Sequence, residues 1–281
     1  MDEHHDQTGQ ATAPRLRVLQ WNVQGLRPKR HQVLQAIVED KLDVVLLQET
    51  LTQPEFEWRV AGFTCHTLPS TEAGGRGCVT LVRSSIPHHR IPAPAHCGDG
   101  VEVLAVELHL GAIQLPVYNI YRSPRYELQC GELLTLAAHS SLLVAGDFNA
   151  HHPLLSSVSL TNRTGRHLAT LLQEVPHIRL LNTGEATHVR GGRLDLTLVS
   201  SDLRPCARWQ VHPTLTSDHY ATLTTLIVAP PAPHLLRPPA MVEPEKSGLG
   251  EVQCLSGRVV GLVCTARGSR ATGEGLHGGH R

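Results

Sequence analysis

The sequence predicts an α/β fold in which two β-sheets pack face to face, and three observations support this fold class. The chain has 281 residues, enough for one large α/β domain with a well-buried core or for two small ones. Apolar runs of strand length alternate with segments of helical period. Some of these runs follow one another through a short turn, whereas others follow a helix, and this mixture favours a two-sheet sandwich over a purely parallel sheet.

The N-terminal part is expected to form a strand, a helix and a second strand. Residues 16–21 alternate between apolar and polar and predict a strand that ends at Asn22. Residues 30–40 predict a helix, because their apolar side chains recur on one face. Residues 44–47 are a continuous apolar run, typical of a buried strand, and this strand delivers Gln48-Glu49-Thr50 to its end.

The middle of the chain is rich in strands. Residues 79–82 form a short apolar run. Residues 101–110 and 113–120 are longer runs separated by Gly111-Ala112, which is typical of a hairpin or meander. Residues 127–138 then predict a helix.

The last third of the chain again alternates between predicted strands and a predicted helix. Residues 141–145 predict a buried strand that ends at the polar motif Gly146-Asp147-Phe148-Asn149. A helix is expected at 166–174, and strands are expected at 193–199 and 220–228.

The two ends differ in composition from the rest. Residues 1–14 are polar and are expected to be a disordered lead-in. Residues 229–281 are rich in Pro and then Gly, so we expect a disordered tail. The folded domain is therefore expected to span residues 15–228.

Composition limits the function classes. Lys plus Arg equals Asp plus Glu, at 25 each, so affinity for DNA must come from a local basic face or from metal ions. The seven Cys residues show no Cys-x-x-Cys spacing and are interpreted as reduced thiols of an intracellular protein. No apolar stretch approaches the roughly 18 residues of a membrane span. A membrane protein is therefore not expected.

Polar motifs at the ends of apolar runs carry the functional information. Asp147 and Asn149 lie two residues apart at the exit of a predicted strand, so their side chains should point the same way. Ser217-Asp218-His219 adds a carboxylate and an imidazole. This set of oxygen and nitrogen donors, without cysteine, suits a hard divalent cation and a phosphate ester better than zinc or a thiol nucleophile.

Six short polar motifs follow one another along the chain. They are Trp21-Asn22, Gln48-Glu49-Thr50, Asn119-Ile120-Tyr121-Arg122-Ser123-Pro124, Gly146-Asp147-Phe148-Asn149, Arg193-Leu194-Asp195 and Ser217-Asp218-His219. They occur in the order seen in the endonuclease/exonuclease/phosphatase family, and the chain resembles that family from residue 16 to residue 228. Four finer matches are 149–153, 161–166, 181–188 and 195–199. These segments resemble the apurinic-type endonuclease domain of jockey-like non-LTR retrotransposons.

The resemblance implies a metal site and a four-layer, DNase-like α/β sandwich with the active site at one end. Glu49 would bind the cation with Asn22 beside it, and Asp218 would be a further ligand of the metal or of water. The expected ion is Mg²⁺ or Mn²⁺, because such a cation needs only one or two protein carboxylates and keeps its other positions for water and phosphate oxygen.

The resemblance also implies catalytic roles. Asp147 would position or deprotonate the attacking water, and Asn149 would orient that water. Asp195 would hold the imidazole of His219 and favour its charged form, which can bond the scissile phosphate. Tyr121 would donate its phenol to a phosphate oxygen. Two further candidates for substrate or backbone contacts are Thr187 and Ser217.

Each of these residues also has a purely structural explanation. A Gly-Asp-x-Asn sequence often forms a turn, and Asn22 could cap the helix that follows it. Asp195 could pair with Arg193, and Tyr121 could pack on a sheet edge. The functional interpretation is favoured because six such motifs fall in family order, each beside an apolar segment that can hold it rigid.

The expected function is metal-dependent phosphodiester hydrolysis on DNA, as an endonuclease of retrotransposon origin whose nick would prime target-site reverse transcription. The expected partner is DNA, and the chain is expected to act as a monomer in the nucleus, away from membranes. One alternative is a phosphatase acting on a small phosphorylated substrate. The other is a decayed nucleic-acid-binding relic without its reverse transcriptase, because Leu155-Ser156-Ser157 replaces the Trp-Gly usual in related domains.

Overall fold

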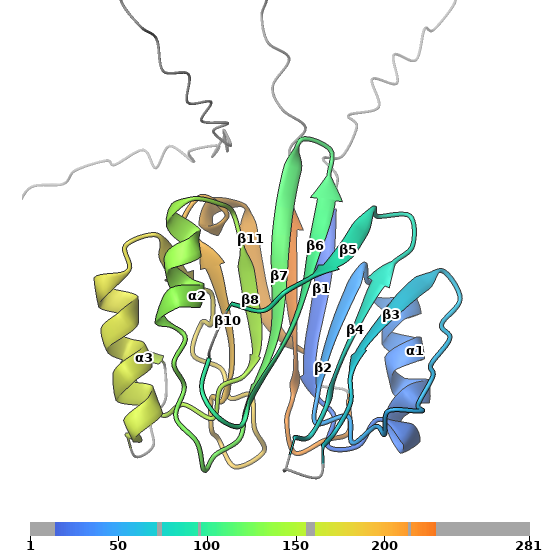
Figure 1. The fold of residues 1–281 in the computed structure, drawn as a ribbon, viewed down its shortest axis with the longest axis horizontal. Coiled ribbons are helices and arrows are strands. Elements are labelled where there is room, and N and C mark those ends of the chain that lie inside the picture. Colours follow the sequence, from blue (N-terminus) through green and yellow to red (C-terminus); the bar gives the residue numbers. More distant parts are fainter. Residues whose placement is uncertain (1–14, 72–74, 95–96, 156–160, 213–214, 229–281) are drawn as a thin grey trace, which may run out of the picture.

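The computed structural model describes residues 15–71, 75–94, 97–155, 161–212 and 215–228. These residues form two six-stranded sheets (Figure 1). The first sheet has the order β11 (Ala207–His212), β12 (Ala221–Ile227), β1 (Arg15–Asn22), β2 (Val44–Gln48), β4 (Cys78–Arg83) and β3 (Phe63–Leu68). The second has the order β5 (His88–Ile91), β6 (Val101–Leu110), β7 (Ile113–Arg122), β8 (Leu143–Asp147), β10 (Asp195–Ser200) and β9 (Ile178–Leu180).

Both sheets are mixed, with one parallel pair of strands at the centre of each. In the first sheet β1 and β2 are parallel, and in the second β7 and β8 are parallel, whereas the other neighbours are antiparallel. Parallel neighbours end at the same edge of a sheet. The side chains that follow β1 and β2, and those that end β7 and β8, are therefore delivered to one end of each sheet.

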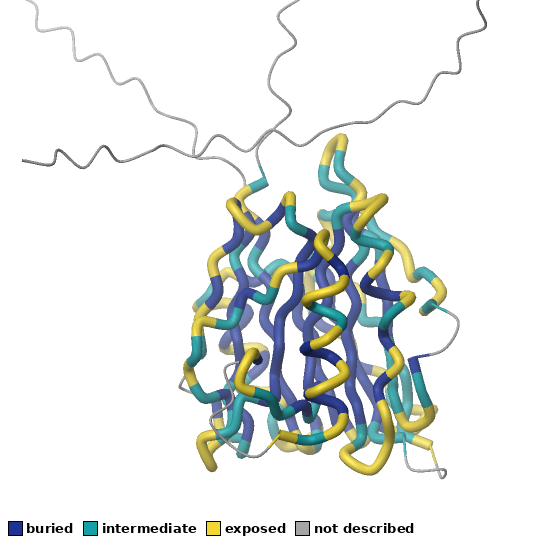
Figure 2. The backbone as a smooth tube through the Cα atoms, turned by 90° about the vertical axis from the view of Figure 1, so that its left-hand side faces the viewer, coloured by how far each residue is buried: buried dark blue, intermediate teal, exposed yellow. Residues whose placement is uncertain are grey.

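Helices cover the two outer faces and complete four layers. The helix α1 (Arg30–Glu39) packs on the first sheet, and α2 (Gly131–Thr135) and α3 (Arg163–Glu174) pack on the second (Figure 1). Each of the three interfaces between layers has its own apolar cluster. Figure 2 shows the buried strands at the centre and the more exposed helix and loop segments around them. This arrangement confirms the expected α/β sandwich.

The space between the sheets changes from apolar to polar along the strands. On β1, Leu16 and Val18 belong to the inter-sheet core, but Gln20 and Asn22, further along the same face, are buried polar residues. Side chains two residues apart share a face of a strand. Buried polar groups must form hydrogen bonds, and here they do so across the gap, since Gln48 Nε2 of the first sheet donates to Asn119 Oδ1 of the second at 2.6 Å.

Several expectations need correction. The helix predicted at 127–138 is shorter, comprising α2 and a 3₁₀ turn at Leu136–Ala138, because residues 127–130 are held by other contacts such as Gln129 N to Cys97 O. The edge strands β3, β5, β9 and β11 were not expected. The thiol prediction is wrong for Cys206, which is disulfide-bonded, whereas the other cysteines in the described segments are free.

The expected lead-in (1–14) and tail (229–281) lie outside the described residues. The boundaries of the domain at 15 and 228 therefore stay a prediction. Within the part of the chain that is described, no helix combines the length and the apolar character needed to cross a membrane.

Candidate active site

The candidate site lies at the polar end of the inter-sheet space, where the central strands of both sheets end. Asn22 pairs with Gln48 at the end of the β1–β2 pair, and Tyr121 pairs with Asp147 at the end of the β7–β8 pair. Asp195, at the start of β10, is the antiparallel partner of Asp147. The strand register alone thus brings together motifs that lie far apart in the sequence.

Sharp backbone turns direct the functional side chains at the strand ends. Gln24, Glu49 and Asn149 all have positive φ angles, of 43°, 50° and 46°. Such conformations are uncommon for residues other than glycine and cluster at functional sites. Gly146 is required for a different reason, because a Cβ atom there would lie 1.8 Å from Ile120 O of the neighbouring strand.

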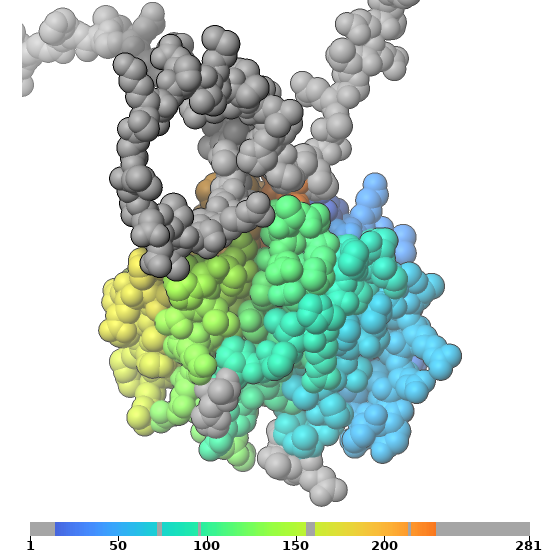
Figure 3. Space-filling model, turned by 45° about the horizontal axis from the view of Figure 1, so that its top comes forward, coloured from blue at the N-terminus to red at the C-terminus, as the bar shows by residue number. Residues whose placement is uncertain are grey.

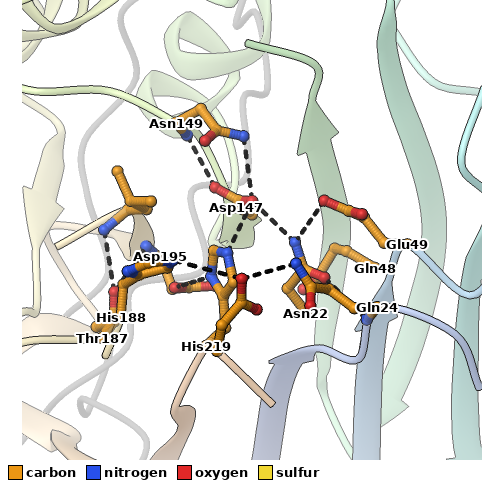
Figure 4. Close-up of polar contacts among 12 residues, drawn as sticks. Asn22, Gln24, Gln48, Glu49, Asp147, Asn149, Thr187, His188, Asp195 and His219 are labelled. Atoms are coloured by element: carbon orange, nitrogen blue, oxygen red, sulfur yellow. Dashed lines mark hydrogen bonds and ion pairs between the residues drawn. The ribbon is translucent and has the colours of Figure 1, made fainter. Parts of the chain in front are cut away.

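A carboxylate–imidazole–carboxylate array forms the centre of the site (Figure 4). His219 Nδ1 lies 2.8 Å from Asp195 Oδ2, and His219 Nε2 lies 3.8 Å from Asp147 Oδ2. All three side chains are buried, with 4% or less of each residue exposed. Trp21 Nε1 donates to the His219 carbonyl oxygen at 3.0 Å and fixes the backbone that carries the ring.

Burial and neighbouring charges shift the pKa values of His219 and Asp147, which face each other. Burial alone would lower the pKa of His219, but the Asp195 carboxylate outweighs it and raises the pKa to about 10. Burial and repulsion by Asp195 raise the pKa of Asp147 to about 7, although the His219 charge opposes this. The site therefore holds an imidazolium next to a carboxylate that titrates near neutral pH.

A second group of contacts joins Asp147 to the first sheet. Asn22 Nδ2 donates to Glu49 Oε1 at 3.0 Å and to Asp147 Oδ2 at 2.9 Å. Asn149 N and Nδ2 also donate to the Asp147 carboxylate, at 2.9 and 3.1 Å. Burial, with the Glu49 and Asp147 carboxylates nearby, raises the pKa of Tyr121 far above its ordinary value, so its phenol is a hydrogen-bond donor.

Asp218 has partners different from those of Asp147. Its Oδ2 accepts a hydrogen bond from Gln24 Nε2 at 2.7 Å and lies 3.5 Å from His188 Nε2. The His188 ring packs edge-on against the His219 ring, with centroids 4.9 Å apart. The structure therefore places Asp218 in the site, and Gln24, whose backbone N donates to Asn22 Oδ1 at 3.2 Å, links it to Asn22.

The two candidates for substrate contacts take different positions. Thr187 is fully buried, and its Oγ1 accepts hydrogen bonds from Leu194 N and Asp195 N at 3.0 and 3.1 Å. It therefore holds the backbone at Asp195 in place, which is the backbone contact expected as one of its two roles, and substrate binding by Thr187 stays a prediction. Ser217 is half-buried and donates to Asn22 O at 2.9 Å, so it ties the Asp218 loop to the end of β1.

Several residues of the site were not predicted from the sequence, among them Gln24, described above, and three others. Arg76 Nε and Nη2 donate to Glu49 Oε2 at 3.0 and 2.5 Å, so this carboxylate is already paired with a cation. Gln20 Nε2 donates to Asp195 Oδ1 at 2.8 Å from the opposite sheet. His188, already described, lies within one of the finer family-like segments, which was its only signal in the sequence.

The donors present fit a hard divalent cation. The Glu49 and Asp147 oxygens both lie within 3.0 Å of the Asn22 amide nitrogen, so two carboxylates converge on one partly positive group. Oxygen donors of this kind suit Mg²⁺ or Mn²⁺. Among the described residues, the clusters able to hold an ion also include His219 with Asp147 and Asp195, and His219 with His188 and Asp218.

Comparison with known proteins agrees with this geometry. Residues 19–219 match the sequence model of the endonuclease/exonuclease/phosphatase family. Two relatives from Drosophila melanogaster are described as probable RNA-directed DNA polymerases. The one from transposon X-element is 28% identical over 221 residues, which are 75% of this chain and 24% of the relative. The one from transposon BS is 26% identical over 216 residues, which are 74% and 22%. The chain thus spans about a quarter of the length of these relatives.

Solved structures show the same fold. The endonuclease domain of TRAS1, a telomere-specific non-LTR retrotransposon, superposes with a TM-score of 0.61 and 19% identity over 76% of this chain and 98% of that domain. An AP endonuclease from Leishmania major gives a TM-score of 0.61 and 17% identity over 76% and 88%. At these identities the likeness concerns the fold, and it supports the expected four-layer architecture.

Proposed function

Because the chain belongs to the endonuclease/exonuclease/phosphatase family, we propose that it is a divalent-metal-dependent DNA endonuclease that nicks duplex DNA. The observation that carries this proposal is the buried array in which His219 lies between Asp195 and Asp147, 2.8 and 3.8 Å away. Hydrolysis needs one group that accepts a proton from the attacking water and another that donates a hydrogen bond to the phosphoryl oxygen as negative charge develops on it. The array offers both at one point.

Different residues of the site have different roles in the proposed hydrolysis. Asp147, with Asn149 bonded to its carboxylate, orients the attacking water and accepts its proton. His219, kept protonated by Asp195, donates a hydrogen bond to the phosphoryl oxygen on which charge develops. The phenol of Tyr121 is a further donor to phosphate.

Glu49 and Asn22 are the proposed residues for holding the metal ion, with Asp218 as a further ligand of the metal or of water. A Mg²⁺ or Mn²⁺ ion bound there would supply Lewis-acid stabilisation of phosphate charge. Arg76 pairs with Glu49 through Oε2, which leaves Oε1 with the Asn22 amide as the side facing Asp147. Arg76 therefore fixes the Glu49 carboxylate and adds positive charge beside the phosphate position.

Basic residues near the strand ends support DNA as the substrate. The formal net charge is zero, so no global field draws the chain to DNA. Arg76 pairs with Glu49 in the site, and three further arginines lie in segments that flank the strands of the site. They are Arg27 after β1, Arg125 after β7 and Arg190 before β10. Contacts of this kind bind phosphate without regard to base sequence, as a monomeric nicking enzyme would require.

The proposed biological origin is a non-LTR retrotransposon. The two Drosophila melanogaster relatives are named as transposon polymerases, and this chain aligns with about a quarter of each. The nick would then provide a primer for reverse transcription at the target site. Action in the nucleus stays a prediction that accompanies this origin.

The test is conversion of supercoiled plasmid to relaxed circles by the purified chain in the presence of magnesium. The wild-type chain is expected to nick, and His219→Ala and Asp147→Ala are each expected to lower the rate by about 100-fold to 1000-fold, since each removes a preorganised group. His139→Ala, an exposed histidine outside the site, is the matched control and should nick normally.

Other outcomes would reject the proposal. Release of inorganic phosphate from small monoesters, with plasmid left intact, would identify a phosphatase. A catalytically decayed relic would neither nick plasmid nor release phosphate, and the two site variants would then be indistinguishable from the wild-type chain.

A further inference from the structure

Three metal-ligating side chains lie together on the β5–β6 pair, outside the active site. His89 of β5 and Glu107 of β6 are directly opposite each other in the antiparallel register. His109 lies two residues further along β6, so it shares the face of Glu107. Val106 and Leu108, which alternate with them, pack in the core between the sheets. The cluster therefore belongs to the outer face of the second sheet.

One donor atom from each of the three residues lies within 4.8 Å of the donor atoms of the other two. His109 Nε2 lies 3.2 Å from His89 Nδ1 and 3.6 Å from Glu107 Oε1, and His89 Nε2 lies 4.0 Å from the same oxygen. Atoms that bind zinc at about 2.0–2.2 Å in a tetrahedral site are roughly 3.3–3.6 Å apart. Small side-chain rotations would place one donor atom from each residue on a common centre.

The donor types select the ion. Imidazole nitrogens suit zinc, copper and nickel, whereas magnesium and calcium prefer oxygen ligands only. The side chains of His89 and His109 are 56% and 36% exposed, so an ion can enter and keep water at its remaining position. We propose that His89, Glu107 and His109 form a second metal site, which binds a divalent transition metal such as Zn²⁺.

This site is independent of hydrolysis. Tyr121, in the active site, pairs with Glu102 on β6, and His109 lies seven residues further along that strand. At about 3.4 Å per residue this separates the two sites by roughly 24 Å. The cluster lies toward the β6–β7 hairpin, which projects at the top of Figure 1, and the segments coloured as β5 and β6 are at the surface in Figure 3.

The position of the site suggests what metal binding would do. The strand β5 is at the edge of its sheet and pairs only with β6. An ion held by His89 on β5 and by Glu107 and His109 on β6 would cross-link the edge strand to its neighbour. Because such an ion binds the folded state, it would raise the stability of the fold with increasing zinc concentration.

The experiment is calorimetric titration of Zn²⁺ into the full-length chain at saturating Mg²⁺, with the wild type, His89→Ala, His109→Ala and His31→Ala compared. The last is the matched control, an exposed histidine on α1. Because other residues, such as His188, could also bind zinc, the measured quantity is the difference between the proteins. Thermal melting of each protein with and without zinc gives a second readout.

The wild type and His31→Ala are expected to bind one more zinc ion than the two cluster variants, or to bind it at least about 10-fold more tightly. Loss of even an outer partner of a metal ligand typically weakens binding by that factor. The melting temperature should rise with zinc more in the first two proteins than in the other two. Nicking in magnesium should be the same in all four.

Equal zinc stoichiometry and affinity in all four proteins would overturn the proposal. So would an extra zinc ion that binds without Mg²⁺ but not at saturating Mg²⁺, since that would indicate an oxygen site. If an alanine variant does not fold, His89→Gln and His109→Gln keep the size and polarity of the side chain, and the same comparison applies to them.

Discussion

His219 is the residue on which the charges of the site converge. Its ring lies 2.8 Å from Asp195 and 3.8 Å from Asp147, and the Asp195 carboxylate raises its pKa to about 10 against the opposing effect of burial. The ring is therefore an imidazolium at neutral pH. Nδ1 donates to Asp195, and Nε2 is left to donate toward the position of a phosphoryl oxygen near Asp147. A neutral ring could not donate from both nitrogens.

Replacing Asp195 by Asn tests this assignment through the pH profile. Hydrolysis needs the ionised Asp147 and the protonated His219 ring, so activity should rise as the pH passes the Asp147 pKa of about 7 and fall as it passes the pKa of His219. In the wild type this fall in activity, the alkaline limb of the pH profile, is expected near pH 10. Asp195→Asn removes the charge that raises the pKa, so the limb should move down by roughly 1–3 units. The measurement is kcat/KM for nicking from neutral to alkaline pH.

Asp202→Asn is the control for this series, because Asp202 is an exposed carboxylate that accepts a hydrogen bond from Ser141 away from the site. Its profile should follow the wild type. An alkaline limb that stays in place in Asp195→Asn would mean that the His219 imidazolium is not the group required for hydrolysis.

Some residues of the site could be predicted from the sequence, and others could not. Asp195 and His219 were predictable because each belongs to a short motif beside an apolar run, in an order that resembles a family. Gln20 and Arg76 were not. Gln20 occupies an inward position of a strand that otherwise appears amphipathic, and Arg76 lies between Gly75 and Gly77, where the sequence indicates only a turn. Their partners come from elements far away in the sequence.

At the scale of single elements, the loop that follows β8 is held by the start of α3. Asn162 caps this helix, since its Oδ1 accepts from Gly165 N at 2.7 Å. The same side chain donates through Nδ2 to Asn149 O at 2.7 Å and accepts from His151 N at 3.1 Å. One residue therefore starts the helix and fixes the backbone of Asn149, which bonds the Asp147 carboxylate.

Two substitutions at Asn162 separate these roles. Asn162→Ala should lower the free energy of unfolding by about 0.5–2 kcal/mol through loss of the cap, and it should also slow nicking. Asn162→Asp keeps the capping oxygen but lacks the donor to Asn149 O. It should recover most of the stability while nicking stays slow. Denaturant unfolding and plasmid nicking measure the two effects, and recovery of both together would show that Asn162 acts only as a cap.

Secondary structure was predictable where periodicity was strong. The hairpin of β6 and β7, with its turn at Gly111-Ala112, and the strands β1, β2 and β8 were expected close to their observed positions. The missed strands lie toward the sheet edges and have partly exposed or short patterns, such as β3 with no fully buried residue and β9 with three residues in all. Their strand state comes from pairing with a neighbour, which no local pattern reveals.

At the scale of the whole molecule, the sandwich places a polar reaction centre at one end of an apolar core. The inter-sheet space is filled by apolar side chains along most of its length, and then by a hydrogen-bonded chain from Thr222 through Gln20 and Gln48 to Asn119. This network joins the two sheets and reaches Asp195. The side chains of the candidate site, which come from both sheets, are therefore held by rigid elements and not by loops alone.

The fold class could be predicted from the alternation of strands and helices, but the pairing of strands could not. Neighbours such as β1 and β12 lie some 200 residues apart in the sequence and share no local signal. The meeting of Asp147 with Asn22 depends on this pairing and on the packing of the two sheets. For the same reason the candidate site was predictable as a set of residues, whereas its hydrogen bonds were not.

If the polar end of the inter-sheet space is a metal-dependent nicking centre, the nicking rate of Glu49→Gln as a function of magnesium concentration should show it most directly. This change keeps the size of the side chain and removes the charge proposed to hold the cation. Glu39→Gln, an exposed glutamate on α1, is the matched control. Melting curves and salt-dependent DNA binding, which rests on Lys and Arg contacts, should be retained in both.

Wild type and Glu39→Gln are expected to nick at the same rate and with the same magnesium dependence. Glu49→Gln is expected to nick on the order of 100-fold more slowly and to need more magnesium for its residual activity. Nicking by folded Glu49→Gln at the wild-type rate and at the same magnesium concentration would show that Glu49 does not hold the cation used in hydrolysis.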